Sequence, residues 1–213
     1  MKNYFGLLAL PALAIAAAID PRDTAADALV QIVKARPNPS NPGNSCPTGD
    51  LSANISADKS QVTLIFDKNN AWIIGPNTPD SQRERTCIYM LTLEWPMKCT
   101  ATTFKVTAHG TIHLADKSYG AYFQSTNVFQ DGTMPSRSEA QIALDGTKYG
   151  GSLGSDFFEA RTVDITRTVN NANQRQTNVT MDTRMFLRDN GKHEANDFGL
   201  FSVDFTFENS RSC

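Results

Sequence analysis

The sequence predicts an all-β protein, built as a two-sheet antiparallel sandwich of about nine or ten strands. Apolar and polar residues alternate in one run after another, and Gly, Pro, Asn and Asp separate these runs. β-branched and aromatic residues fill the runs, and beyond the N-terminus no segment keeps a 3.6-residue apolar period for long. This is the pattern of half-buried strands joined by turns.

The first 18 residues predict a secretory signal peptide. Lys2 gives a positive start, residues 5–18 form an apolar run too short to span a bilayer, and residues 16–18 are small alanines suited to cleavage. A buried N-terminal helix is the alternative, but the run ends at IDPRD without a polar helical face. We therefore expect a secreted, extracellular protein with one mature domain over residues 19–213.

The first half of the chain supplies the first strands. VQIVKA is followed by a segment too rich in Pro, Gly and Asn for regular structure. DLSANIS and SQVTLIF flank the turn ADKS and predict a hairpin, with Val62, Leu64 and Phe66 on one face. CIYMLTLEW ends at Pro96, and TFKVTAHGTIHLA alternates as a half-buried strand does. These strands cover residues 30–35, 50–56, 60–66, 87–95 and 103–115.

The second half continues in the same way. YGAYFQSTNVF, AQIAL, ARTVDITRTV, NVTMDTRMFL and LFSVDFTFE each combine alternation with β-forming residues. In the last of them, one face is predicted to hold Phe201, Val203, Phe205 and Phe207. These strands cover residues 119–129, 140–144, 160–169, 178–187 and 200–208.

The charge of the chain argues against nucleic acids and anionic membranes as partners. The formal net charge is −2, and removal of Lys2 with the signal peptide makes the mature chain slightly more acidic. The basic stretch RER at 83–85 is short and contains its own carboxylate. We expect a monomer that needs no cofactor.

Four cysteines, an even number in a chain expected to be exported, predict two disulfides rather than a metal or catalytic site. None lies in a CxxC pair. Cys87 and Cys99 are expected at opposite ends of an extended strand. At about 3.3 Å per residue they would lie far beyond the roughly 4.4–6.8 Å between bridged Cα atoms. Of the three possible connectivities this disfavours one and leaves two open. The cysteines are Cys46, Cys87, Cys99 and Cys213.

Two long segments and the C-terminal cysteine carry a family resemblance. The segments are GNSCPTGDLSANISADKSQVTLIF and IIGPNTPDSQRERTCIYMLTLEWP. They resemble the secreted fungal proteins grouped as domain of unknown function 4360, which show a Cys-Pro-x-Gly turn, a hairpin strand and a GP…DSR…C segment that leads into a strand. The resemblance covers most of the mature chain and is sharpest between residues 43 and 96. It implies a secreted β-rich domain, and it implies no activity.

The resemblance also implies a disulfide pairing. Family members carry their third cysteine late, in a Ser-Pro-Cys-Gly segment, whereas this chain has Cys99 directly after WPMK. By this analogy Cys46 pairs with Cys87, and Cys99 takes the place of the late cysteine as the partner of Cys213.

The histidines do not form a convincing metal site. His109 and His113 are four residues apart, which on a strand means about 13 Å. Zinc needs both nitrogens at about 2.0–2.1 Å, so the two could share an ion only if Gly110 introduced a bulge. We interpret them as imidazoles that face solvent, and His193 as a polar loop residue.

Nucleophilic serine chemistry is not indicated, because no G-x-S-x-G elbow occurs. Carboxylates are harder to exclude, since a glycosidase needs only two of them across a groove. Asp164 and Asp182 occupy the polar phase of their predicted strands, so a shared face is possible. The candidate carboxylates are Asp156, Glu159, Asp164, Asp182 and Asp189.

Asn54 in NIS and Asn178 in NVT are N-glycosylation sequons on or beside predicted strands. Among the aromatic residues, Trp72, Tyr119 and Tyr122 are the candidates for contact with a sugar or a protein, and core packing is the alternative role for them. Trp72 lies next to the GPNTPDSQRER loop and is the first of these to test by mutation.

Three functions are consistent with these features. The leading hypothesis is a secreted, non-enzymatic sandwich that binds a cell-wall polysaccharide or a host protein, as an effector or surface protein would. The second is a glycan-directed hydrolase that uses a carboxylate pair, and the third is a structural component of a wall or matrix.

Overall fold

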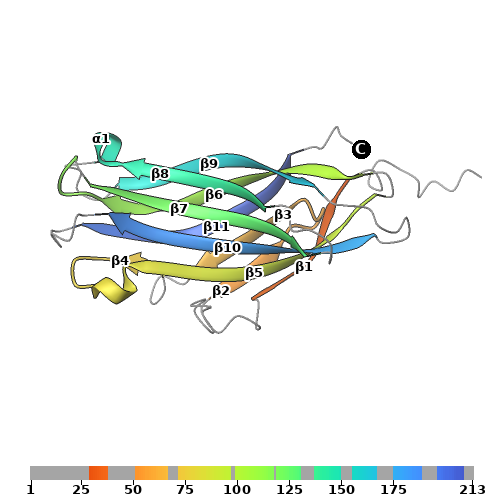
Figure 1. The fold of residues 1–213 in the computed structure, drawn as a ribbon, viewed down its shortest axis with the longest axis horizontal. Coiled ribbons are helices and arrows are strands. Elements are labelled where there is room, and N and C mark those ends of the chain that lie inside the picture. Colours follow the sequence, from red (N-terminus) through yellow and green to blue (C-terminus); the bar gives the residue numbers. More distant parts are fainter. Residues whose placement is uncertain are drawn as a thin grey trace, which may run out of the picture.

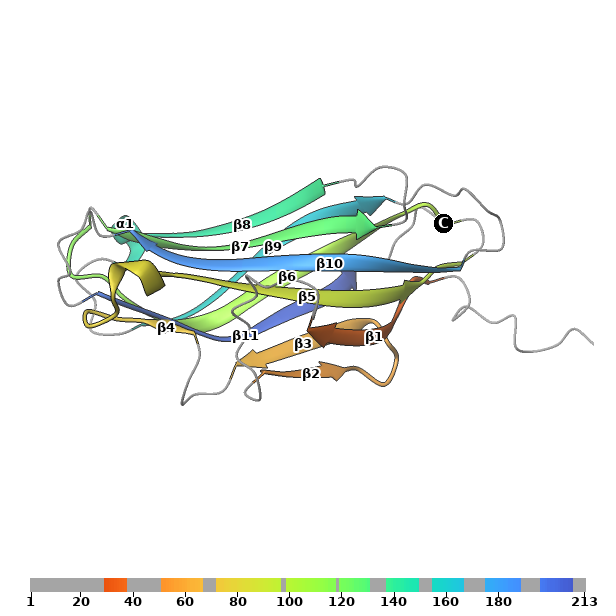
Figure 2. The ribbon, with the colours of Figure 1, turned by 60° about the horizontal axis from the view of Figure 1, so that its bottom comes forward.

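The fold is a sandwich of two antiparallel sheets in a computed structural model of the chain. The structure describes residues 29–37, 51–66, 72–96, 99–117, 119–130, 137–149, 155–166, 175–188 and 196–208. Figure 1 shows the long strands of both sheets running along the longest axis of the molecule, and Figure 2 shows the same strands from below. The all-β architecture with two sheets confirms the fold class that the alternation predicted.

The first sheet has the strand order β1-β5-β10-β7-β8, and the second has the order β2-β3-β11-β6-β9, with the short β4 paired to β11. The bounds in the first sheet are β1 Gln31–Pro37, β5 Glu84–Glu94, β7 Gly120–Gln130, β8 Arg137–Asp145 and β10 Gln176–Arg188. Those in the second sheet are β2 Leu51–Ile55, β3 Gln61–Phe66, β4 Ile73–Ile74, β6 Ala101–His113, β9 Ser155–Thr166 and β11 Asp197–Glu208. A 3-10 turn covers Asp80–Gln82, and the short helix α1 covers Gly146–Tyr149.

The core lies between the two sheets and is filled by alternate residues of each strand. Val62, Leu64 and Phe66 are all at most 2% exposed, so the predicted hairpin face is confirmed. The turn of this hairpin places Lys59 at φ 59°, and the Asp58 carboxylate accepts hydrogen bonds from Ser60 N at 3.2 Å and from Ser56 Oγ at 2.6 Å. These bonds lower the pKa of Asp58, with the Ser56 hydroxyl as the largest cause.

The strands differ from the sequence expectation in number and in several boundaries, most of all at the start of β9. The described residues form eleven strands, because Ile73–Ile74 adds a two-residue strand that no alternation could reveal. β9 begins at Ser155, five residues before the predicted start at 160. The signal peptide, Cys46, Asp189, His193 and Cys213 lie outside the described residues.

The predicted face of Phe201 is wrong, because β11 contains an irregularity at this residue. Leu200 pairs with Gly110, and Ser202 pairs with His109, so Phe201 is an extra residue in β11 that has no register partner on β6. The extra residue reverses the alternation, and Phe201 leaves the phase of Val203 and Phe205. A side chain built on Gly199 would meet Phe201 Cε1 at 3.6 Å and the half-exposed Ile73 at 3.6 Å, which places Phe201 on the outer face of the second sheet.

Gly110 makes room for this irregular pairing. A Cβ atom at position 110 would overlap the carbonyl oxygen of Gly199 and would lie 2.7 Å from Cε1 of Phe157. Because one of these neighbours is backbone and the other is a ring that is 4% exposed, neither can move away cheaply. A glycine is therefore required where β6 faces the irregular part of β11.

A polar contact beside α1 holds β9 at the edge of the second sheet. Glu159 of β9 accepts hydrogen bonds from Lys148 Nζ and, at 3.0 Å, from Tyr149 Oη. The hydrogen bond from Lys148 lowers the pKa of Glu159 more than any other cause. Adjacent residues of a strand point to opposite faces, so anchoring Glu159 turns its neighbour Phe158 toward solvent, where the ring is 65% exposed.

We predict that Gly110→Ala destabilises the fold by about 1–3 kcal/mol or more, because the added methyl group overpacks a site that cannot relax. Gly75→Ala is the matched control, since nothing lies within 4 Å of a Cβ at that position. Urea denaturation measures both variants. Equal stability of the two would show that the close approach at Gly110 does not constrain the fold.

We predict that Glu159→Gln flattens the acid limb of the stability profile. The pKa of Glu159 is lowered in the folded protein, so the contribution of its carboxylate is complete above its ordinary pKa and is lost as the pH falls through the folded value. Wild type should therefore lose more stability than the variant between about pH 6 and about pH 3. Urea midpoints across this range provide the measurement, and parallel profiles would contradict the contact.

Candidate functional site

The aromatic residues singled out in the sequence lie mostly in the core. Trp72 is 1% exposed and packs on Phe66 with the ring centroids 4.7 Å apart, and Tyr119 is 5% exposed. A ligand on the outer surface does not reach either ring in this structure. Tyr122 lies on β7, opposite Phe186 and Ala143 in register. Nearness to a loop in the sequence therefore did not distinguish a core ring from a surface ring.

The two histidines of β6 point outward, as the alternation predicted, and each has its own carboxylate partner. His109 Nε2 lies 3.2 Å from Asp204 Oδ2, and His113 Nδ1 lies 3.7 Å from Asp197 Oδ2. The irregularity beside Gly110 belongs to β11, so it does not bring the two imidazoles together. In the described part of the chain, no group of three or more His, Cys, Asp or Glu residues is placed to hold a metal ion.

The carboxylates expected on a shared face lie on opposite sides of the molecule. Asp164 belongs to β9 of the second sheet and accepts a hydrogen bond from Thr103 Oγ1 at 2.7 Å. Asp182 belongs to β10 of the first sheet and lies 3.4 Å from Arg184. Both side chains are in the outward phase of their strands, so both layers of the sandwich separate them. The predicted strand phase is confirmed for both residues, and the shared face that this phase left possible does not occur.

Two other carboxylates of the second sheet, Asp156 and Asp204, do not form a glycosidase pair either. Asp204 and Asp156 share its outer face, but they pair with Thr107 and Thr111 from opposite sides of β6. Two strand spacings and four residues along the strand separate their Cα atoms by about 16 Å. Glycosidase carboxyl groups lie about 5–9.5 Å apart. The register therefore leaves this pair too far apart for that chemistry.

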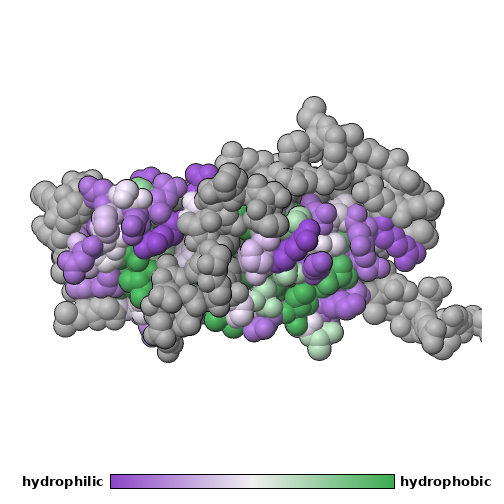
Figure 3. Space-filling model, turned by 90° about the horizontal axis from the view of Figure 1, so that it is seen from below, coloured by the Kyte–Doolittle hydropathy of each residue, from purple (hydrophilic) through white to green (hydrophobic). Residues whose placement is uncertain are grey.

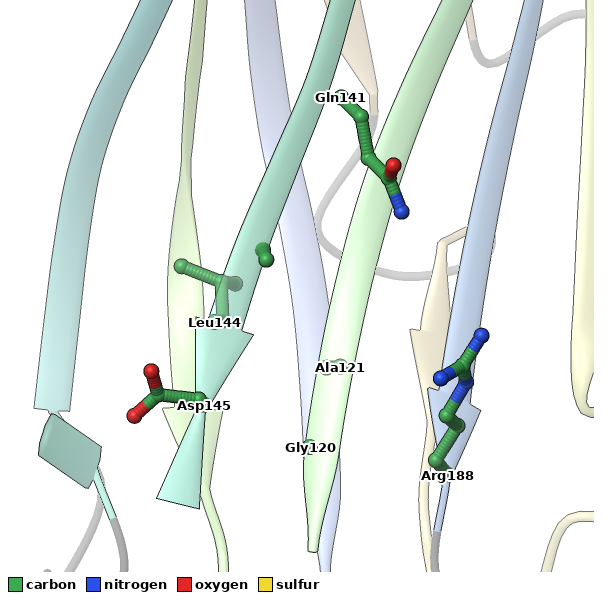
Figure 4. Close-up of a pocket in the computed structure, with 7 residues that line it drawn as sticks. Gly120, Ala121, Gln141, Leu144, Asp145 and Arg188 are labelled. Carbon is green, nitrogen blue, oxygen red and sulfur yellow. The ribbon is translucent and has the colours of Figure 1, made fainter. Parts of the chain in front are cut away.

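The outer face of the first sheet contains a small hollow of about 150 Å³ at the start of β7. Gly120 and Ala121 form its floor, and Gln141 and Arg188 flank it from β8 and β10, as Figure 4 shows. The Asp145 carboxylate points away from the floor in this view. It caps α1, accepting hydrogen bonds from Thr147 N at 2.9 Å and Lys148 N at 3.1 Å. The hollow is smaller than the roughly 300 Å³ at which small-molecule sites begin.

The outer face of the second sheet contains a larger hollow, which we call the Phe158 hollow. Its volume is about 340 Å³, and its lining consists of His109, Gly110, Asp156, Phe157, Phe158 and Phe201. Phe158 is the most exposed large apolar residue of the described chain, at 65%. The His109 ring meets it edge-on, with the ring centroids 4.2 Å apart and an interplanar angle of 85°. An exposed ring thus stands beside a space of ligand size.

Polar groups around the Phe158 hollow are partly fixed and partly available. Asp204 accepts a hydrogen bond from Thr63 Oγ1 at 2.5 Å and faces His109 Nε2, so three strands orient the imidazole. The remaining hydrogen-bonding capacity of this ring is on Nδ1. Asp156 lies two residues before Phe158, on the same face and exposed. Among the described residues no group donates a hydrogen bond to its carboxylate, so it can accept one from a ligand.

Other exposed apolar residues on this face are spread out. Ile65 is 40% exposed on β3, and Ile73 is 50% exposed on β4. The view from below looks onto an edge of the sandwich and not onto this face, and the described residues seen there are mostly hydrophilic, with hydrophobic ones among them (Figure 3). On the outer face of the second sheet, Ile73 and Phe201 flank Gly199 beside the hollow, whereas Ser202 and His109 separate Ile65 from Phe158. The apolar area of this face is therefore small and interrupted by polar groups.

The sequence contains one local signal for this site. Phe157 and Phe158 are adjacent in SDFFEA, and adjacent residues of a strand face opposite sides. One of the two rings in a strand at the edge of a sheet must then point away from the core. The outward position of Phe201 had no such signal, because it depends on the irregular pairing of β11 with β6.

The remaining predicted sites are placed as follows. Cys87 and Cys99 are both 0% exposed; Cys87 lies near the start of β5, and Cys99 lies beyond the end of that strand. Their predicted partners lie outside the described residues, so the pairings Cys46–Cys87 and Cys99–Cys213 stay predictions. Asn54 and Asn178 are both exposed, on the second and the first sheet respectively.

No helix in the described ranges combines the length and the hydrophobicity that a membrane-spanning segment needs.

Several solved structures are similar to this chain at low identity. A mannan-recognising carbohydrate-binding module, TmCBM27, is 9% identical with a TM-score of 0.35, and the match covers 84% of this chain and 99% of that one. The xylan-binding module CBM15 is 14% identical with a TM-score of 0.28, covering 84% and 95%. The C-terminal CBM6 of a marine laminarinase, LamC from Zobellia galactanivorans, is 6% identical with a TM-score of 0.25, covering 84% and 98%. At these scores we take no function from the likeness.

No curated protein matches the chain. A family model does match it, over residues 38–211, and this agrees with the resemblance of the cysteine and hairpin motifs. The chain therefore belongs to the family described as a domain of unknown function, DUF4360.

Proposed function

We propose that this chain is a secreted, non-enzymatic protein that binds an extracellular glycan on the outer face of its second sheet. The observation that carries the proposal is the exposure of Phe158, at 65%, beside a hollow lined by His109 and Asp156. A single exposed ring is common on protein surfaces, so Phe158 is informative here because a space of ligand size with polar groups in its lining lies beside it.

The chemistry of the Phe158 hollow suits a sugar. A pyranose ring presents a face of C–H groups and an edge of hydroxyl groups. The flat face of Phe158 can pack against the C–H face of the sugar. The Asp156 carboxylate can accept hydrogen bonds from the sugar hydroxyl groups, and the His109 imidazole can donate to them or accept from them. Apolar contact with a few convergent polar groups is the usual composition of a small-ligand site.

The size of the apolar contact sets the strength of binding. Full burial of a Phe side chain contributes about 1.5–3 kcal/mol, so covering the exposed part of Phe158 contributes about 1–2 kcal/mol. That is about a tenfold change in the dissociation constant. One ring therefore supports weak binding to each sugar, and a polysaccharide with many repeats supplies the remaining affinity through multivalency.

A protein partner is less well supported by the same face. A specific protein interface buries about 800 Å² on each partner around a continuous, well-packed centre. Here Ser202 and His109 separate Ile65 from Phe158, and Ile73 and Phe201, which flank Gly199, add only a small apolar area next to the hollow. Cleavage of the bound glycan is not part of the proposal, because Asp164 and Asp182 lie on opposite faces and Asp156 and Asp204 are too far apart.

Export and disulfide formation belong to the same proposal. The apolar run of residues 5–18 and the even number of cysteines support it. The complete burial of Cys87 and Cys99 is consistent with cysteines that have a structural role.

We predict that Phe158→Ala weakens binding to a polysaccharide about tenfold, because the variant lacks the apolar surface that the sugar covers. Affinity electrophoresis and calorimetry with soluble mannan, xylan and laminarin provide the measurement. Gln141→Ala is the matched control, since Gln141 lies at the hollow of the first sheet. Both positions are exposed, so stability should change by less than about 0.5 kcal/mol in either variant.

Loss of binding in Gln141→Ala with unchanged binding in Phe158→Ala would place the site on the first sheet. Absence of binding to every polysaccharide tested, by wild-type protein that carries no N-glycans, would contradict the proposed function itself.

We predict that the secreted protein contains two disulfides, Cys46–Cys87 and Cys99–Cys213. Intact mass after alkylation without reduction should show no modified thiol, and non-reducing peptide mapping should recover these two linked pairs. A linked pair formed by Cys46 and Cys99 would overturn the family analogy, and four alkylated cysteines would overturn the expectation of an oxidising compartment.

A further inference from the structure

Asn54 lies on the same outer face as the Phe158 hollow. It belongs to β2, the edge strand next to β3, and its side chain is exposed. Its neighbours Ala53 and Ile55 pack against the core, so the alternation turns Asn54 outward. In register it is paired with Thr63 of β3. The same row continues with Asp204 of β11 and ends at Thr107 of β6. Asn54 therefore stands in one row with the residues that orient His109.

This asparagine is the acceptor of the sequon Asn54-Ile55-Ser56. The second sequon provides a contrast, because Asn178 lies on β10 in the middle of the first sheet. There its Oδ1 accepts a hydrogen bond from Thr92 Oγ1 at 2.9 Å. A glycan on Asn178 would project from the opposite side of the sandwich, so the two sequons differ in the face that they would cover.

The distance from Asn54 to the site is short for an attached glycan. Neighbouring strands lie about 4.8 Å apart, so Asn54 is about 10 Å from the Asp204 strand and about 14 Å from the His109 strand. Ile65, which is 40% exposed, lies on the strand between Asn54 and Ser202. A chain of several pyranose rings that starts at Asn54 spans this distance and covers Ile65 on the way.

We propose that an N-linked glycan on Asn54 regulates the Phe158 hollow by occupying it in competition with external glycan. This inference rests on the proposed function. The attached glycan has the same C–H faces and hydroxyl edges that the hollow is suited to bind. A short tether gives it an effective concentration on the order of millimolar, which competes well with an external sugar that binds one hollow weakly. A glycan on Asn178 cannot reach this face.

The test compares four forms of the full chain secreted by a yeast host: wild type, Asn54→Gln, Asn178→Gln, and wild type from which an amidase has removed the N-glycans. Mass spectrometry of the Asn54 peptide measures occupancy. Affinity electrophoresis with mannan, xylan and laminarin measures binding. We expect Asn54 to be occupied, and we expect Asn54→Gln and the deglycosylated wild type to bind at least about tenfold more tightly than wild type. Asn178→Gln should bind as wild type does.

The outcomes separate the two proposals. An unmodified Asn54 in the secreted wild type, or equal binding by all four forms with Asn54 occupied, overturns the regulation and leaves the binding site in place. Failure of Asn54→Gln and of the deglycosylated wild type to bind any of the three polysaccharides overturns the proposed function. Tighter binding after loss of the Asn178 glycan alone would show that the competing glycan is on the other sheet. The deglycosylated wild type keeps the comparison valid if Asn54→Gln fails to fold.

Discussion

Alternate residues of each strand form the core of this sandwich. Where β11 pairs irregularly with β6, this alternation is reversed, and the reversal affects which side chains line the Phe158 hollow. Opposite Gly110, one additional residue in β11 moves Phe201 from the core phase to the outer face. The absence of a side chain at Gly110 permits this pairing, because the Gly199 carbonyl and the Phe157 ring occupy the space that a Cβ would need. The Phe158 hollow follows from these two features together.

The exposure of Phe158 depends on the same alternation at the edge of the sheet. Phe157 is buried between the layers, and Glu159 contacts Lys148 and Tyr149 of α1. With both neighbours held on the inner side, Phe158 cannot enter the core without breaking one of these contacts. The carboxylate network of Asp204 then places His109 against the exposed ring. Contacts that stabilise the sandwich therefore also hold the Phe158 ring at the surface, next to polar groups.

The sequence allowed most of the fold to be predicted and little of the site. Val62, Leu64 and Phe66 alternate strictly beside a clear turn, so both the hairpin and its buried face could be predicted. The phase of Asp164 and Asp182 was predictable too, but phase does not say to which of two sheets a strand belongs. Trp72 and Tyr119 are buried because of tertiary packing that nearness to a loop does not reveal. Phe201 faces outward because two distant strands pair irregularly, and no local pattern encodes that.

Recognition is proposed on one face of the molecule, and mapping the bound face by NMR tests this most directly. Amide chemical shifts of the isotope-labelled protein would be followed while a soluble oligosaccharide is added. The largest changes are expected in residues 107–111, 156–160 and 199–204, around Phe158 and His109. Changes concentrated in residues 120–121, 141–145 and 186–188 would place the ligand on the first sheet and contradict a site at Phe158.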